Sequence, residues 1–173
     1  MSFLSNLFRK QRDPREDLRP LWHRTVELAR ERELYATCGV ADSVAGRFDA
    51  ITAVLALILL RMERVPELIP PSALLTELFV DDMDGQMRQS GVGDVVVGKH
   101  MGKVMGTMGG RLGAYRDAMA DGAEDNALTE AVERNVTLTE GGDAACVAQR
   151  MCALGERLKQ TSDDALLAGD IAA

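Results

Sequence analysis

The longest apolar run in the chain is AITAVLALILL at residues 50–60, and it carries no charge. Its eleven residues are far fewer than the roughly 20 that an apolar helix needs to cross a bilayer. Asp42 or Ser43 stands before the run as a candidate N-cap, and Val65-Pro66 follows it as a helix-ending pair. We therefore predict a helix over about 43–64 that is buried in the core of a globular protein.

Caps and breaks divide the rest of the chain into further helices. Asp13-Pro14-Arg15-Glu16 is typical of a helix start, Ser72 and Asp94 are candidate N-caps, and Gly91-Val92-Gly93 indicates a turn. Aromatic residues make up only 4% of the chain, so Leu, Val, Met and Ala must fill the core, which favours helices. Helices are predicted over about 14–38, 43–64, 72–90, 94–120, 124–137 and 143–160. The sequence predicts an all-α fold, a single compact bundle of about six helices.

The predicted domain spans residues 13–161, and residues 162–173 are expected to form a frayed tail with at most one short helical turn. Residues 1–12 combine Phe and Leu with Arg and Lys, so they form either a flexible end or a contact with an anionic membrane surface. The net charge is −7, which argues against nucleic acid as a partner.

The chain has three cysteines, Cys38, Cys146 and Cys152, whose spacing matches no zinc site. An odd number of cysteines without a recognisable signal peptide points to reduced thiols in a cytosolic compartment. We expect all three to act as small hydrophobic core residues.

The segment 94–120 has two regular stripes. Glycine recurs every four residues, and a second stripe of mostly Met runs beside it. Each glycine costs a helix about 1 kcal/mol relative to alanine, so some contact must compensate. One interpretation is a smooth groove that receives an apolar partner helix; the other is that both stripes are packed inside this chain. The stripe residues are Gly98, Gly102, Gly106 and Gly110, with Met101, Met105, Met108, Leu112, Tyr115 and Met119.

An acidic cluster, Asp81-Asp82-Met83-Asp84, precedes this segment. Its surroundings do not match a calcium-binding EF-hand loop, and no catalytic Ser–His–Asp or Cys–His set is indicated. The cluster is either a solvated helix face or part of a patch for a basic partner. In the second case Arg47, Arg88 and Lys99 are candidates to complete the patch. A rival interpretation is an enzyme that uses the carboxylates of Asp82, Asp84 and Asp94 in a pocket.

Several motifs together resemble the ubiquinol–cytochrome c chaperone family. They are Gly46-Arg47-Phe48-Asp49, then Phe79 with Asp82-Met83-Asp84 and Met87-Arg88, then Gly91-Val92-Gly93-Asp94 with Val97-Gly98-Lys99 and Met101. Trp22, Tyr35, Gly110-Arg111 and Tyr115 fit the same pattern, so the resemblance covers roughly 21–119. Two positions depart from it: Gly109 stands where an aromatic residue is expected and Val54 where a histidine is expected.

The resemblance implies a helical assembly factor without catalytic activity and without a cofactor. Members of the family bind newly made cytochrome b during biogenesis of ubiquinol–cytochrome c reductase, in some cases with a small partner chaperone near the ribosome. This chain is then expected in the cytoplasm, either soluble or peripheral to the inner membrane. A hydrophobic segment of cytochrome b would contact the glycine and methionine stripes, and Arg47, Asp82, Asp84, Arg88, Asp94 and Lys99 would contact its polar loops. An adaptor for another membrane protein is the main alternative.

Overall fold

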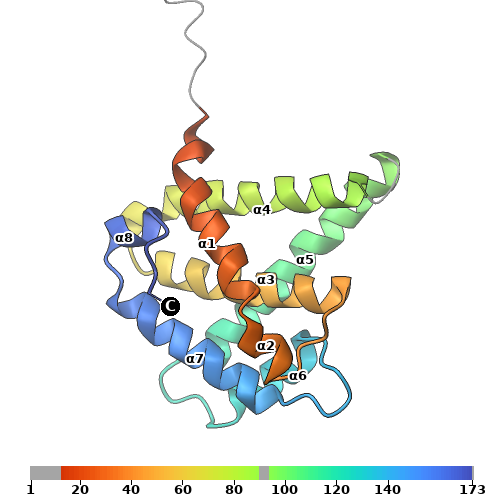
Figure 1. The fold of residues 1–173 in the computed structure, drawn as a ribbon. Helices are drawn as coiled ribbons and strands as arrows, with labels where there is room; N and C mark the ends of the chain where they lie inside the picture. Colours follow the sequence, from red (N-terminus) through yellow and green to blue (C-terminus); the bar gives the residue numbers. More distant parts are fainter. Residues whose placement is uncertain (1–12, 90–93, 173) are drawn as a thin grey trace, which may run out of the picture.

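The computed structural model describes residues 13–89 and 94–172, without the side chains of Met87 and residues 94–101. Its elements, in chain order, are η2 (Pro14–Leu18), α1 (Arg19–Ala29), α2 (Arg32–Ala36), α3 (Val44–Met62), η3 (Pro66–Leu68), α4 (Ile69–Gln89), α5 (Asp94–Ala118), α6 (Ala127–Asn135), α7 (Ala144–Gln160) and α8 (Asp163–Leu167). The predicted all-α fold is confirmed (Figure 1). The helices share one hydrophobic core.

Helix α3 lies at the centre of the molecule, and α1, α5 and α7 pack against it (Figure 1). The helix begins after Ser43, whose side-chain oxygen accepts a hydrogen bond from the backbone N–H of Gly46 at 3.2 Å. Residues 50–59 are all buried, which confirms the buried helix predicted from the apolar run. Within the described ranges, no helix has the length and apolar character needed to cross a membrane.

Helices α4 and α5 follow α3, and the end where they approach each other projects beyond the other helices at the upper right of Figure 1. Helix α4 begins at Ile69, so the predicted N-cap at Ser72 is wrong. Two prolines occupy its first turn, where proline is tolerated because those N–H groups have no helical partner. The Ser72 hydroxyl instead donates a hydrogen bond to the Ile69 carbonyl at 2.8 Å. Helix α5 begins at Asp94, close to the predicted start.

The C-terminal segment is more ordered than the sequence indicated. It contains α8, and the side chains of Leu166 and Ile171 are buried in the core. Arg24 on α1 donates two hydrogen bonds to the Ile171 carbonyl, at 2.8 and 3.2 Å. The expectation of a frayed tail is therefore corrected, because the apolar side chains of Leu166 and Ile171 are buried and α8 packs against α1. The prediction for residues 1–12 lies outside the described residues.

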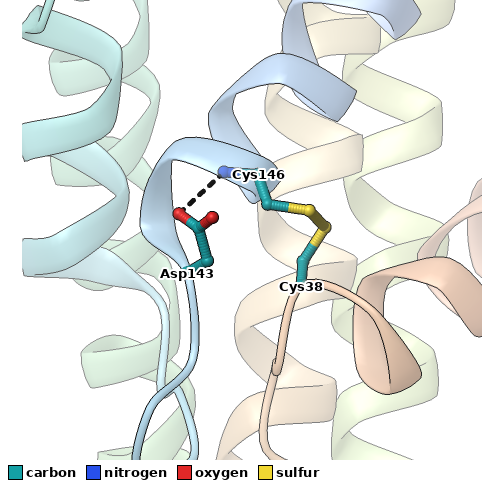
Figure 2. Close-up of a disulfide and its surroundings, with 3 residues drawn as sticks. All are labelled: Cys38, Asp143 and Cys146. Atoms are coloured by element: carbon teal, nitrogen blue, oxygen red, sulfur yellow. Dashed lines mark hydrogen bonds between the residues drawn. A yellow bond between two sulfur atoms is a disulfide. The ribbon is translucent and has the colours of Figure 1, made fainter.

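The cysteines also differ from expectation. Cys38 and Cys146, which are 108 positions apart in the sequence, form a disulfide (Figure 2). Cys152 is free and exposed. Only Cys38 is buried. The prediction of three reduced core thiols is thus wrong, because the fold places the loop after α2 beside the first turn of α7, a proximity that no local pattern encodes.

Candidate functional site

Helix α5 presents two different faces. An α-helix turns by about 100° per residue, which places Gly102, Gly106, Gly109 and Gly110 on one side. All four are exposed, and within the described part of the chain no atom of another element lies within 4 Å of the position that a Cβ would take. We call these four residues the glycine face. The opposite side of α5 packs into the core. The glycine face therefore points away from the other described helices.

The methionine stripe is divided between the core and the surface. Met108 is 3% exposed and Tyr115 is fully buried, whereas Met105 is 39% exposed at the edge of the glycine face. The interpretation that both stripes are internal is therefore wrong for the described glycines. Met108 and Tyr115, expected to contact a partner, are core residues instead, because they lie on the same side of α5 as the buried Arg111.

For four further candidates, the structure describes only the helical backbone; they are Gly98 and Met101 of the stripes and the charged residues Asp94 and Lys99.

Buried polar contacts fix the position of α5. Arg111 is 8% exposed and Asp49 on α3 is 5% exposed. The Arg111 Nη2 donates to Asp49 Oδ1 at 2.5 Å, and its Nη1 donates to the hydroxyl of Thr52. The second oxygen, Asp49 Oδ2, accepts hydrogen bonds from the backbone N–H and the hydroxyl of Thr137, at 2.8 and 2.6 Å. The Arg111 guanidinium also lies 5.4 Å from the centre of the Phe48 ring.

This polar cluster joins three elements, because Thr137 lies just after α6. A buried ion pair is tolerated only where hydrogen bonds compensate both charges, and here the carboxylate accepts from three groups. Sequence reasoning quoted Asp49 and Arg111 as motif residues but did not pair them. One signal could have suggested the pair: Asp49 and Arg111 are each a charged residue on the buried side of its helix, α3 and α5.

Tyr115 lies one turn after Arg111 on the same side of α5. Burial raises the pKa of its phenol to about 12, with the nearby Arg111 opposing the shift more weakly. The hydroxyl therefore remains protonated at neutral pH, and Tyr115 serves as a neutral packing residue.

The charged candidates of α4 make local contacts. The Arg88 Nε donates to Asp84 Oδ2 at 2.7 Å, one turn away, and the Gln86 side chain donates to Asp82 at 3.1 Å. Arg47 on α3 pairs with Asp42 at 2.6 Å and not with the acids of α4. The structure therefore does not join Arg47 to the acidic cluster.

Asp82 lies in a surface cleft between α1 and α4, beside Trp22 and His23. Asp84 does not line this cleft, so Asp82 and Asp84 do not converge in it as the enzyme interpretation predicted. Among the described residues, no three His, Cys, Asp or Glu side chains are grouped closely enough to hold a metal ion. The charges of α4 thus lie on a polar surface, where Asp82 and Asp84 contact residues one turn away and Asp81 pairs with Arg15 of η2 at 2.5 Å.

The described residues define an all-α protein. Its helix α5 is held by a buried ion pair on one side and carries four exposed glycines on the other. Residues 36–173 match the family model described as ubiquinol-cytochrome C chaperone, so the chain belongs to the ubiquinol-cytochrome C chaperone family. The match continues to the C-terminus, well beyond the region of the quoted motifs. The fold is also similar to the crystal structure of the Cbp3 homolog from Brucella abortus, with a TM-score of 0.78 and 30% identity over 99% of this chain and 96% of that chain. Curated proteins include no significant match.

Proposed function

We propose that this protein is a non-catalytic assembly chaperone for ubiquinol–cytochrome c reductase that binds a hydrophobic segment of newly made cytochrome b on the glycine face of α5. The observation that carries the proposal is the open space around Gly102, Gly106, Gly109 and Gly110. Four glycines in a helix forgo several kcal/mol, at about 1 kcal/mol each, and no contact within the described chain accounts for them. Family membership supports the class of client.

The surface suits an apolar helix as its partner. Small residues let two helix backbones approach closely, as in the packing of membrane-spanning helices. The exposed Met105 beside the glycine face is flexible and can adapt to client side chains of different shape. A membrane segment of cytochrome b that has not yet been inserted exposes apolar surface, which the glycine face would cover.

The polar contacts to the client are assigned to Asp82, Asp84 and Arg88 on α4, together with Asp94, Gly98, Lys99 and Met101 at the start of α5. Arg47, whose side chain is exposed and pairs with Asp42, is a further candidate for these polar contacts. The protein would act in the cytoplasm, soluble or peripheral to the inner membrane, with a small partner chaperone or the ribosome near it. An adaptor for a different membrane protein would use the same face but would capture another client.

Deletion of the gene is expected to lower the amount of assembled cytochrome b, measured by its haem absorbance in isolated membranes, while other membrane cytochromes stay at their normal level. Re-expression of the intact chain should restore cytochrome b. Normal cytochrome b in the deletion strain would contradict the assigned client, and crosslinking in cells would then identify the protein that is bound instead.

The double change Gly102→Leu with Gly106→Leu is expected to reduce cytochrome b captured by crosslinking by about tenfold or more, because two bulky side chains would hold the client helix away from α5. Thermal stability should not fall, since both positions are exposed and leucine favours the helix. The matched control is Gly102→Ala with Gly106→Ala, which gives a similar gain in helix propensity without the bulk and should retain binding. Full binding by the leucine variant, or its failure to fold, would count against this face.

A further inference from the structure

The Cys38–Cys146 disulfide joins the segment after α2 to the first turn of α7. Cys38 follows α2, and Cys146 lies in the first turn of α7, where Asp143 caps the helix by accepting a hydrogen bond from the Cys146 N–H at 3.1 Å (Figure 2). The two Cα atoms are 5.2 Å apart. The bond therefore links the α2–α3 connection to the start of α7, which directly follows the α6–α7 connection.

Backbone contacts hold the same two connections together without the sulfur atoms. The N–H of Asp143 donates to the Cys38 carbonyl at 2.8 Å, and the N–H of Thr139 donates to the Gly39 carbonyl at 2.8 Å. The Ala41 N–H donates to the Thr137 carbonyl at 2.9 Å. A Cβ built on Gly39, whose φ is +78°, would lie only 2.6 Å from the Cα of Gly142. The two backbone segments are therefore in close contact. These contacts would keep the two thiols near each other after reduction.

The crosslinked region is also coupled to α5. Thr137, whose carbonyl is part of this backbone pairing, donates two hydrogen bonds to Asp49, and Asp49 pairs with Arg111 on α5. A looser α6–α7 connection would weaken the Thr137 bonds first. The Asp49–Arg111 pair would then lose part of the compensation that buried charges need.

We propose that the Cys38–Cys146 disulfide is a reversible redox site, reduced by a dithiol, that sets how firmly the α6–α7 connection and, through Asp49, α5 are held. Cys146 is the more exposed partner, since Cys38 is fully buried. A reductant thiolate attacks the Cys146 Sγ, and Cys38 leaves as a thiolate that takes up a proton. The second thiol of the reductant then closes its own disulfide and releases Cys146 as a thiol. One S–S bond breaks, one forms, and two protons and two electrons pass to this chain.

The test uses the full chain with Cys152→Ser, which removes the exposed third thiol and leaves the crosslink unchanged. Without reductant, we expect no thiol to be labelled by an alkylating reagent; after incubation with a dithiol, Cys38 and Cys146 should be labelled together. Hydrogen exchange should rise about tenfold or more over residues 137–143 and severalfold around Arg111. The melting temperature should fall by about 5–10 °C in one cooperative transition and recover on reoxidation.

The matched control is Cys38→Ser with Cys146→Ser in the same background, which should resemble the reduced form and should not respond to the dithiol. Free thiols at both positions before reduction would overturn the proposal, as would exchange that is unchanged on reduction. Unfolding of the whole chain on reduction would also overturn it, because the site would then be a structural crosslink. A rise in exchange that stops at residue 143 would overturn the coupling to α5.

Discussion

Replacement of Arg111 by methionine is expected to lower the free energy of unfolding by about 3–5 kcal/mol. The change removes the positive charge but leaves Asp49, 5% exposed, as a buried carboxylate with Thr137 as its remaining described donor. The hydrogen bond to Thr52 and the contact with the Phe48 ring are also lost. Chemical denaturation of the purified variant, followed by circular dichroism, measures the loss.

The control for this prediction replaces both partners. Arg111→Met with Asp49→Asn removes both charges, and the asparagine side-chain oxygen can still accept a hydrogen bond from Thr137. Because the larger part of the penalty comes from an uncompensated charge, the double variant should recover about half of the lost stability or more. A loss below about 1 kcal/mol in the single variant would show that the ion pair is not needed to hold α5.

Gly46→Ala is expected to cost about 3 kcal/mol, although alanine is the better helix former. A Cβ at Gly46 would lie 2.0 Å from the carbonyl oxygen of Ala41, a backbone atom that cannot move away without disturbing the turn before α3. The same turn contains the Ser43 cap, which accepts its hydrogen bond from the Gly46 N–H. A thermal melt of the variant would report the loss as a lower melting temperature.

Gly106→Ala provides the matched comparison, because it makes the same substitution within a helix at a position where no described atom of another element lies within 4 Å of the new Cβ. This variant should be more stable than the parent by about 0.5–1 kcal/mol. The two changes are thus expected to have opposite signs. A stabilising effect of Gly46→Ala would contradict the close approach of Ala41, and a strongly destabilising effect of Gly106→Ala would contradict the open glycine face.

Local signals made much of the helical structure predictable. The buried helix α3 follows from an uncharged apolar run with a serine cap before it, and both features act through neighbouring residues. The predicted N-cap at Ser72 failed because two nearby prolines fit equally well inside a first helical turn, so local chemistry allowed two different starts. The family could be recognised from the motifs because they keep a fixed order along the chain.

The candidate site could be predicted only in part. Spacing by four residues shows that Gly102 and Gly106 share one face of a helix, but periodicity does not indicate whether that face points to the core or to solvent. The direction depends on where α3 and α6 lie relative to α5. For the same reason the sequence placed Met108 and Tyr115 with Met105, whereas the structure buries the first two and leaves Met105 at the surface.

The sequence by itself determined the helical class, the burial of the apolar run at residues 50–60 and the family, because these depend on composition, local caps and motif order. The tertiary structure decided the Cys38–Cys146 disulfide, the Asp49–Arg111 pair and the outward direction of the glycine face. Each of these is a relation between residues that lie far apart in the chain or on different helices. Such relations are fixed by packing of the whole core, which no short segment specifies.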